Sequence, residues 1–185
     1  MRVIAGTRRS LPLKTVSSDA TRPTTDRIKE TLFNMLQPYL CEARFLDLFA
    51  GSGAIGIEAL SRGAKEAVFV DQSEEAVKVI RENLAFTRFT EESTVLRSDA
   101  VSAIERMKAG NGSPFDLVFM DPPYRKELEK KVLSALSGSN LLTDETIVIF
   151  EASADSDLTF PEKMGYRILK VKKYGTNCHV WIQQE

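Results

Sequence analysis

The sequence has few of the residues that build metal sites and disulfide frameworks, with 2 Cys and 1 His in 185 residues. Cys41 and Cys178 are far apart and neither belongs to a C-x-x-C pair, so a disulfide framework or a zinc site is not expected. A lone histidine cannot form a cluster, and we expect His179 to be an ordinary polar residue of a terminal strand. These absences favour a reducing cytoplasm and no metal.

Long apolar runs are also missing. No run reaches the roughly 18 residues that span a bilayer, and the first residues lack the pattern of a secretory signal. With 43% hydrophobic and 28% charged residues, the composition is that of a globular protein. The length predicts about one domain, which we divide into a basic hairpin extension at residues 1–20 and a main domain at residues 21–185.

The net charge of −1 conceals an uneven distribution. Residues 1–40 carry 7 Lys/Arg against 3 acids, a sum of +4, so the remaining 145 residues sum to −5. A second basic segment, residues 161–175, holds 5 Lys/Arg and 1 acid. Two basic segments predict a docking surface for a polyanion. Ordinary solvated faces are the alternative interpretation.

Strand-like and helix-like segments alternate through the middle of the chain, which predicts a parallel sheet covered by helices. A hairpin of residues 166–171 and 178–182 then adds antiparallel strands at one edge, and residues 2–5 and 10–16 predict a small β-hairpin at the other end of the chain. The expected strands are 45–48, 67–70, 94–96, 115–120 and 146–150. Three of the expected helices have N-caps in the cluster 24–26, at Ser73 and at Asp99, and two more begin near Ala54 and Lys126.

A glycine-rich turn follows the first of these strands. Residues 51–56, GSGAIG, match G-x-G-x-x-G, and Asp71 lies 20 residues beyond Gly51, as in dinucleotide-binding folds. However, Asp47 ends the strand just before the turn, where a carboxylate would repel a pyrophosphate and favour a cationic ligand. S-adenosylmethionine carries a sulfonium and an ammonium and no phosphate. Gly51 and Gly53 would let the backbone approach it closely.

Two more acids end neighbouring strands, where open α/β sheets bind ligands. Asp71 is placed to accept hydrogen bonds from ribose hydroxyls, and Asp99 from an adenine amino group, with the Ala100 N–H facing the ring. Each also has a purely structural interpretation, Asp71 as a strand end and Asp99 as a helix cap. Together with the glycine turn, they favour a cofactor site.

Asp121-Pro122-Pro123-Tyr124 follows the fourth strand and therefore lies at the same edge of the sheet. The prolines lack N–H donors, so the Asp121 carboxylate and the backbone carbonyls are acceptors for an amine with two N–H bonds. If Asp121 and the Pro122 carbonyl each accept one N–H, the nitrogen is oriented for methyl transfer. Tyr124 would stack on the base. A simple turn is the structural alternative.

These motifs, together with residues 22–34, RPTTDRIKETLFN, and residues 58–63, EALSRG, resemble the bacterial RsmD family over nearly the whole chain. The resemblance implies a class I, Rossmann-like α/β methyltransferase domain. It also implies transfer of a methyl group from S-adenosylmethionine, giving S-adenosylhomocysteine, to the N2 amine of a guanine in 16S ribosomal RNA. The expected partner is that RNA, within a small-subunit particle or assembly intermediate, and we expect a monomer with no membrane partner.

The predicted site residues fall into groups. By the resemblance, Arg22, Thr24 and Thr25 border the active site, and the basic amino-terminal hairpin with Arg8 and Arg9 helps to hold RNA. The predicted catalytic residues are Asp121, Pro122, Pro123 and Tyr124; the predicted cofactor-binding residues are Asp47, Phe49, Ala50, Gly51, Ser52, Gly53, Asp71, Gln72, Asp99 and Ala100.

Three alternatives stay open on the sequence. An amine methyltransferase could act instead on DNA adenine or a protein amide, because the acceptor loop recognises an amine and does not name the base. An NAD-dependent oxidoreductase would use the glycine turn for a dinucleotide. A noncatalytic RNA-binding or assembly protein would keep the pocket without the chemistry.

Overall fold

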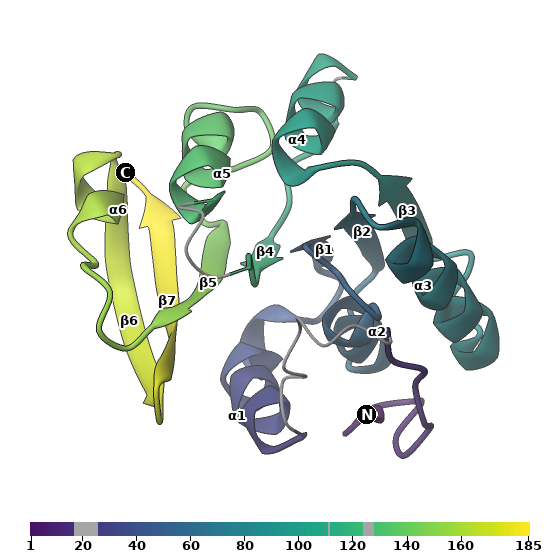
Figure 1. Cartoon of the computed structure of the whole chain (residues 1–185). Coiled ribbons are helices and arrows are strands. Elements are labelled where there is room, and N and C mark those ends of the chain that lie inside the picture. Colours follow the sequence, from purple (N-terminus) through teal and green to yellow (C-terminus); the bar gives the residue numbers. More distant parts are fainter. Residues whose placement is uncertain (17–25, 111, 124–127) are drawn as a thin grey trace.

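The computed structural model describes residues 1–16, 26–110, 112–123 and 128–185. In this part of the chain a 7-stranded sheet has the order β3-β2-β1-β4-β5-β7-β6, with helices on both faces (Figure 1). The strands are β1 (Arg44–Leu48), β2 (Glu66–Asp71), β3 (Ser93–Arg97), β4 (Leu117–Met120), β5 (Ile147–Ser153), β6 (Tyr166–Tyr174) and β7 (Asn177–Gln184). The helices are α1 (Asp26–Leu36), η1 (Gln37–Tyr39), α2 (Ala54–Ser61), α3 (Glu74–Thr87), α4 (Ala100–Ala109), α5 (Leu128–Leu136) and α6 (Phe160–Lys163).

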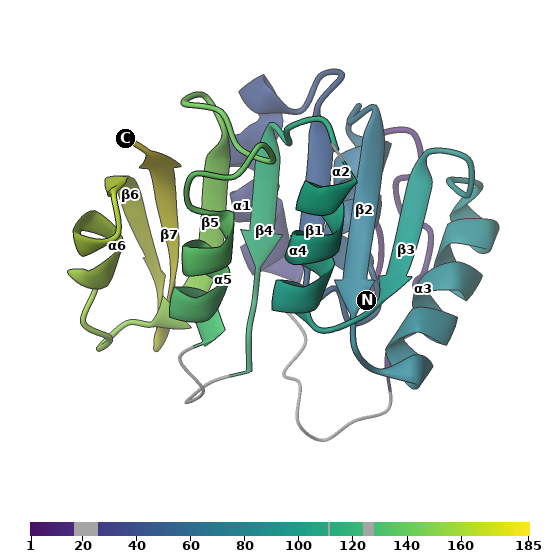
Figure 2. The same ribbon diagram turned by 90° about the horizontal axis from the view of Figure 1, so that it is seen from above.

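The strands from β3 to β5 are parallel, whereas β7 is antiparallel to both of its neighbours. This confirms the predicted mostly parallel sheet with an antiparallel hairpin at its carboxyl-terminal edge. The carboxyl ends of β2, β3 and β4 point to one edge of the sheet, the lower edge in Figure 2. Among the described residues, no helix is both apolar enough and long enough to cross a membrane.

Alternate side chains of the strands enter two separate cores, as the two-residue period of a strand requires. Phe45 and Phe119 belong to the core that α1, α2 and α3 cover. Leu46 and Val118 belong to the core that α4 and α5 cover. The helices thus lie on the two faces seen in Figure 1, and both faces of the central strands are buried. Because both faces are closed, the open end of the sheet is the place for a site.

The predicted amino-terminal β-hairpin is wrong. Residues 1–16 form a tight loop with one isolated antiparallel bridge, Arg2 to Pro12, and no strand. The backbone N–H groups of Ile4 and Ala5 donate to the buried Glu58 carboxylate of α2 at 2.8 and 3.0 Å, so they are not available for cross-strand pairing. The loop is tied to the domain instead, with the side chain of Val3 fully buried in the core.

Candidate active site

Asp47 is buried near the end of β1, with 1% of its surface exposed. Its Oδ2 accepts a hydrogen bond from the Gly56 N–H at 3.0 Å. Burial raises the pKa of Asp47 to about 8, and the neighbouring carboxylates of Asp71 and Asp121 act in the same direction. No cation forms an ion pair with Asp47 within the described ranges. A cationic ligand would therefore relieve the cost of ionising this carboxyl group.

The turn between β1 and α2 has the left-handed backbone that the glycines predict. Gly51 and Gly53 have φ values of +56° and +78°, and Phe49 adopts φ +69°. Positive φ is uncommon for a residue with a side chain and often marks a functional site. A Cβ at Gly51 would face open space, so the turn leaves room for a ligand. From α3, the Asn83 side-chain amide donates to the Ser52 carbonyl at 2.8 Å and fixes the turn.

Asp71 holds the glycine turn in place. Its Oδ2 accepts from the Gly51 N–H at 2.8 Å, and its Oδ1 accepts from the Ser73 N–H at 2.8 Å. Sequence reasoning predicted a role toward ribose and missed this link to Gly51. Each carboxylate oxygen has a second lone pair, so the hydrogen bonds to the chain leave acceptor capacity for hydroxyl groups. Gln72 is exposed beside it.

Asp99 is the N-cap of α4, as its structural interpretation predicted. Its Oδ1 accepts from the Ser102 N–H at 2.9 Å, and hydrogen bonding to Ser102 lowers the pKa of Asp99. Asp99 is exposed and Ala100 is buried at the first turn of the helix. Capping and adenine binding are compatible, since the second carboxylate oxygen remains. The contact with adenine stays a prediction.

Asp121 follows β4 directly, and Pro122 behind it is buried. Burial, and secondarily the charge of Glu151, raise the pKa of Asp121 to about 7. The charge of Asp121 in turn raises the pKa of Asp47, so the Asp121 carboxyl group interacts electrostatically with Asp47 of β1 and with Glu151 of β5. Tyr124 and the predicted site-bordering residues Arg22, Thr24 and Thr25 lie outside the described residues.

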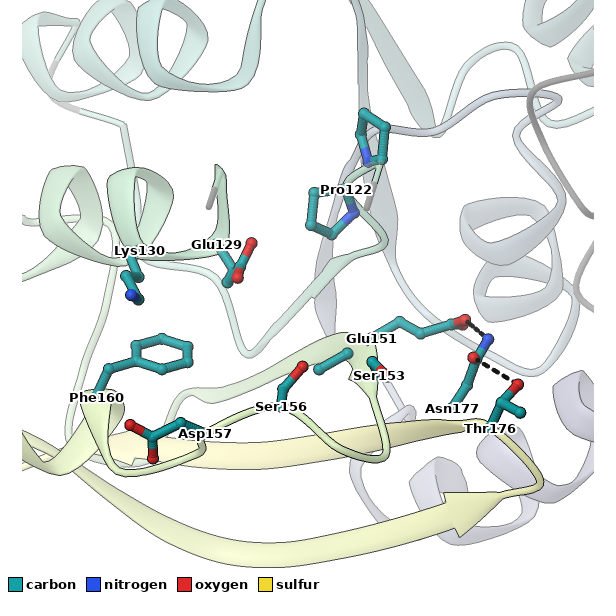
Figure 3. A pocket seen from close by; sticks show the side chains of 12 residues that line it. Pro122, Glu129, Lys130, Glu151, Ser153, Ser156, Asp157, Phe160, Thr176 and Asn177 are labelled. Atoms are coloured by element: carbon teal, nitrogen blue, oxygen red, sulfur yellow. Dashed lines mark hydrogen bonds between the residues drawn. The ribbon is translucent and has the colours of Figure 1, made fainter. Parts of the chain in front are cut away.

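A cavity of about 640 Å³ opens beside the Pro122-Pro123 corner, a size that suits a nucleobase with its sugar (Figure 3). Glu151 and Asn177 lie next to each other in its wall, joined by the hydrogen bond drawn in Figure 3. Sequence reasoning missed both, although Glu151 interrupts the apolar run of β5 as Asp47 interrupts that of β1, and the same signal could have found it. The cavity is lined by Pro122, Pro123, Glu129, Lys130, Glu151, Ala152, Ser153, Ser156, Asp157, Phe160, Thr176 and Asn177.

Arg8 and Arg9 are not brought to this site. The Arg8 N–H donates to the hydroxyl of Ser61, the last residue of α2, whereas the glycine turn precedes the first residue of that helix. An 8-residue helix is about 12 Å long, so the two arginines lie at its opposite end. The Arg8 side chain is also engaged, because its Nε donates to the Thr87 carbonyl at 2.6 Å. Arg9 is exposed.

The strand order and the antiparallel β7 match the fold of the class I methyltransferases. The family model described as "Conserved hypothetical protein 95" matches residues 1–183. The YlbH protein of Bacillus subtilis (strain 168) is 39% identical over 176 residues, which are 95% of this chain and 94% of that protein. The chain belongs to this family, which also includes proteins named ribosomal RNA small subunit methyltransferase D.

One of these relatives, from Haemophilus influenzae, is 36% identical over 95% of this chain and 89% of its own length. Among solved structures, the yhhF protein of Escherichia coli superposes with a TM-score of 0.86 at 34% identity, over 100% of this chain and 98% of that one. The similarity therefore extends over the whole domain, including the carboxyl-terminal hairpin that closes the cavity.

Proposed function

We propose that this chain transfers a methyl group from S-adenosylmethionine to the exocyclic N2 amine of a guanine in 16S ribosomal RNA, leaving S-adenosylhomocysteine. The names of its relatives support a small-subunit ribosomal RNA substrate. We further propose that it acts as a cytoplasmic monomer on a small-subunit particle or assembly intermediate. The sequence pattern predicts a separate basic hairpin extension at residues 1–20. We propose instead that residues 1–16 are a basic loop that belongs to the methyltransferase domain.

One observation carries the proposal: Asp121 directly follows β4, which pairs with β1 on the side of the glycine turn and with β5 on the side of the cavity, and the next residue, Pro122, lines the cavity. Burial is the main cause of the raised pKa values of Asp47 and Asp121, and the smaller charge effects agree with this placement, because Asp121 raises the pKa of Asp47 and Glu151 raises that of Asp121. A group held at the glycine turn and a group held in the cavity would therefore meet at Asp121. This is the arrangement that transfer between a cofactor and an amine requires.

The residues at the glycine turn fit S-adenosylmethionine better than a dinucleotide. A pyrophosphate would need the backbone N–H groups of the turn, but the Gly51 N–H already donates to Asp71. Two acids, Asp47 and Asp71, stand where a phosphate would be repelled, and buried Asp47 favours a cation. When bound, S-adenosylmethionine supplies the methyl group on its sulfonium sulfur. Asp47 and Asp71 would hold the methionine part and the ribose, and Asp99 with Ala100 the adenine.

The chain's contribution to chemistry is the orientation of the acceptor amine. The amine nitrogen of guanine is conjugated with the ring, so its lone pair is poorly nucleophilic. The Asp121 carboxylate and the Pro122 carbonyl would each accept one N–H and direct the lone pair toward the methyl group. As the new N–C bond formed, the nitrogen would become positive, and the Asp121 carboxylate would stabilise that charge and lie next to the N–H proton that the nitrogen must then release.

The proposal is tested with the purified chain, labelled S-adenosylmethionine and small-subunit particles from a strain that lacks the family's gene. We expect transfer into 16S ribosomal RNA, and a loss of roughly a hundredfold or more in Asp121→Ala because the amine is no longer oriented. Asp144→Ala, which removes an exposed acid of the turn before β5, is the matched control and should retain activity.

The result also separates the alternatives. Transfer to DNA or protein but not to ribosomal RNA would favour a different amine acceptor. Unchanged transfer in Asp121→Ala would reject the assignment of the site, and binding of NAD in place of S-adenosylmethionine would reject the class. RNA binding with no transfer to any acceptor would leave a noncatalytic assembly role.

A further inference from the structure

Glu151 is a nearly buried acid with fixed partners in the cavity wall. Its side chain is 10% exposed and pairs across the strands with His179, whose Nε2 lies 3.4 Å from Glu151 Oε2. The Asn177 side-chain amide donates to Glu151 Oε1 at 2.7 Å. A nearly buried carboxylate that Asn177 holds at one oxygen in a cavity wall is pre-organised, so it can take part in selecting what enters.

Asp121 and Glu151 directly follow the last paired residues of two neighbouring parallel strands, β4 and β5. The pairing of β4 with β5 ends at Met120 and Phe150, and the residue that follows each of these is an acid. Residues at equivalent positions of parallel strands share a face and lie about 5 Å apart. Asp121 and Glu151 are therefore neighbours, in agreement with the influence of the Glu151 charge on Asp121. Glu151 lines the cavity itself, and Asp121 directly precedes Pro122, which also lines it.

Guanine carries two adjacent donors on one edge, the N1–H and the N2 amine. In adenine and in 2,6-diaminopurine, N1 is unprotonated and is therefore an acceptor. Of these two bases, 2,6-diaminopurine also has the 2-amine of guanine. Two adjacent carboxylates complement the first pattern and repel the lone pair of the second.

We propose that Glu151 is a specificity-determining residue that accepts the N1–H of the target guanine while Asp121 holds the N2 amine. The inference rests on the proposed function. Asn177, the first residue of β7, is a positioning residue that orients Glu151. Its own Oδ1 is oriented by the Thr176 hydroxyl at 3.2 Å (Figure 3). The antiparallel hairpin would then serve recognition of the base, because its turn completes the cavity wall.

The test compares guanosine with 2,6-diaminopurine riboside at the nucleotide that the wild-type chain methylates. Each is placed in 16S ribosomal RNA by ligation and reconstituted into particles, and kcat/KM for methyl transfer is measured. A hydrogen bond to a charged group is worth roughly tenfold to a hundredfold. We expect the wild type to prefer guanosine by at least about tenfold and Glu151→Gln to lose most of that preference, since its amide group can donate to an unprotonated N1.

The ratio of the two kcat/KM values is independent of the fraction of folded enzyme, so a less stable variant still gives a valid answer. Glu129→Gln removes the same charge from the same cavity on α5 and should keep the wild-type ratio. If Glu151→Gln loses all transfer, Asn177→Ala supplies the ratio, which we expect to fall by a smaller factor.

A ratio that stays at the wild-type value in Glu151→Gln, or in Asn177→Ala where Glu151→Gln is inactive, overturns this proposal and leaves the proposed function intact. An equal fall in Glu129→Gln overturns it as well, since the effect would then be one of charge alone. No transfer by the wild type to guanosine-containing particles overturns the proposed function itself.

Discussion

Asp47 carries a carboxyl group that the fold keeps from water without giving it a cation among the described residues. The unfolded chain ionises this group near its ordinary pKa of 3.8, whereas the folded chain does so near 8. The folded state therefore binds the proton more tightly, and the stability of the free protein falls as the pH rises from about 4 to about 8. A site that awaits a positively charged ligand would show this cost.

We therefore expect Asp47→Asn to stabilise the free protein at pH 8 while it weakens cofactor binding. The stability gain relative to the wild type should exceed about 1 kcal/mol at pH 8 and shrink toward pH 5. Urea unfolding at both pH values measures the gain, and calorimetric titration with S-adenosylmethionine measures the loss of affinity, expected to be tenfold or more. If the free energy of unfolding had the same pH dependence in Asp47→Asn as in the wild type, Asp47 would not be the origin of the loss of stability at high pH.

At the residue scale, the acids at the strand ends were predictable because they break apolar runs at positions that the topology brings to one edge. Glu151 carries the same signal and was still missed, because it adjoins no glycine turn or proline corner. The hydrogen bond between Asn177 and Glu151 could not be predicted from the sequence, because it depends on the register between β5 and β7. The additional bond from Asp71 to Gly51 likewise depends on the path of the turn.

At the scale of elements, α2 joins the amino-terminal loop to the site. Its Glu58 is fully buried, with Lys29 Nζ of α1 at 3.3 Å and Arg62 Nε at 2.8 Å. The same carboxylate accepts the N–H groups of Ile4 and Ala5. Burial lowers the pKa of Lys29, and the charge of Glu58 opposes this shift. One side chain thus holds together the loop, α1 and α2.

Replacement of Glu58 by Gln should therefore destabilise the protein by about 3 kcal/mol, because it leaves buried cations without their counter-charge. Glu82→Gln is the matched control, because its partner Lys14 is exposed and such solvent-exposed pairs contribute little to stability. Chemical denaturation compares the two variants. Equal effects would mean that the buried cluster is no more important than a surface pair.

The contacts of α2 with the amino-terminal loop also explain why the sequence predicted the central elements correctly and the amino-terminal hairpin wrongly. The central strands and helices follow from alternation, caps and glycines, which act within a few residues. Residues 1–16 have local strand character, but the N–H groups of residues 4, 5, 7 and 8 donate to Glu58 and Ser61 of α2, more than 50 residues away. Long-range competition of this kind leaves no trace in a local pattern, and for this reason the predicted hairpin was wrong.

At the scale of the molecule, the basic residues are spread over two separate places. Arg9 lies on the amino-terminal loop, and Lys170, Lys172 and Lys173 are exposed on the edge strand β6. The turn between β6 and β7 also lines the cavity, so β6 extends from the candidate base pocket. This placement favours the lysines of β6 as the residues that contact the RNA backbone. Arg8 is less suited to that contact, because its side chain is hydrogen-bonded to α3.

We expect simultaneous replacement of Lys170, Lys172 and Lys173 by Ala to weaken RNA binding and to reduce its salt dependence. Removal of each lysine that meets a phosphate should lower the slope of log K against log salt by about one. Affinity for S-adenosylmethionine should stay unchanged. Lys65→Ala, at an exposed position before β2, is the control. An unchanged slope in the triple variant would show that β6 does not meet phosphates.

The most direct test of the whole account is a crystal structure of the chain with S-adenosylhomocysteine. We predict that the ribose lies against Asp71, that the adenine lies beside Asp99 and that the sulfur faces Asp121 and Pro122 at the mouth of the cavity. A ligand bound away from the ends of β1 and β4, or a sulfur that points away from Pro122, would contradict the account.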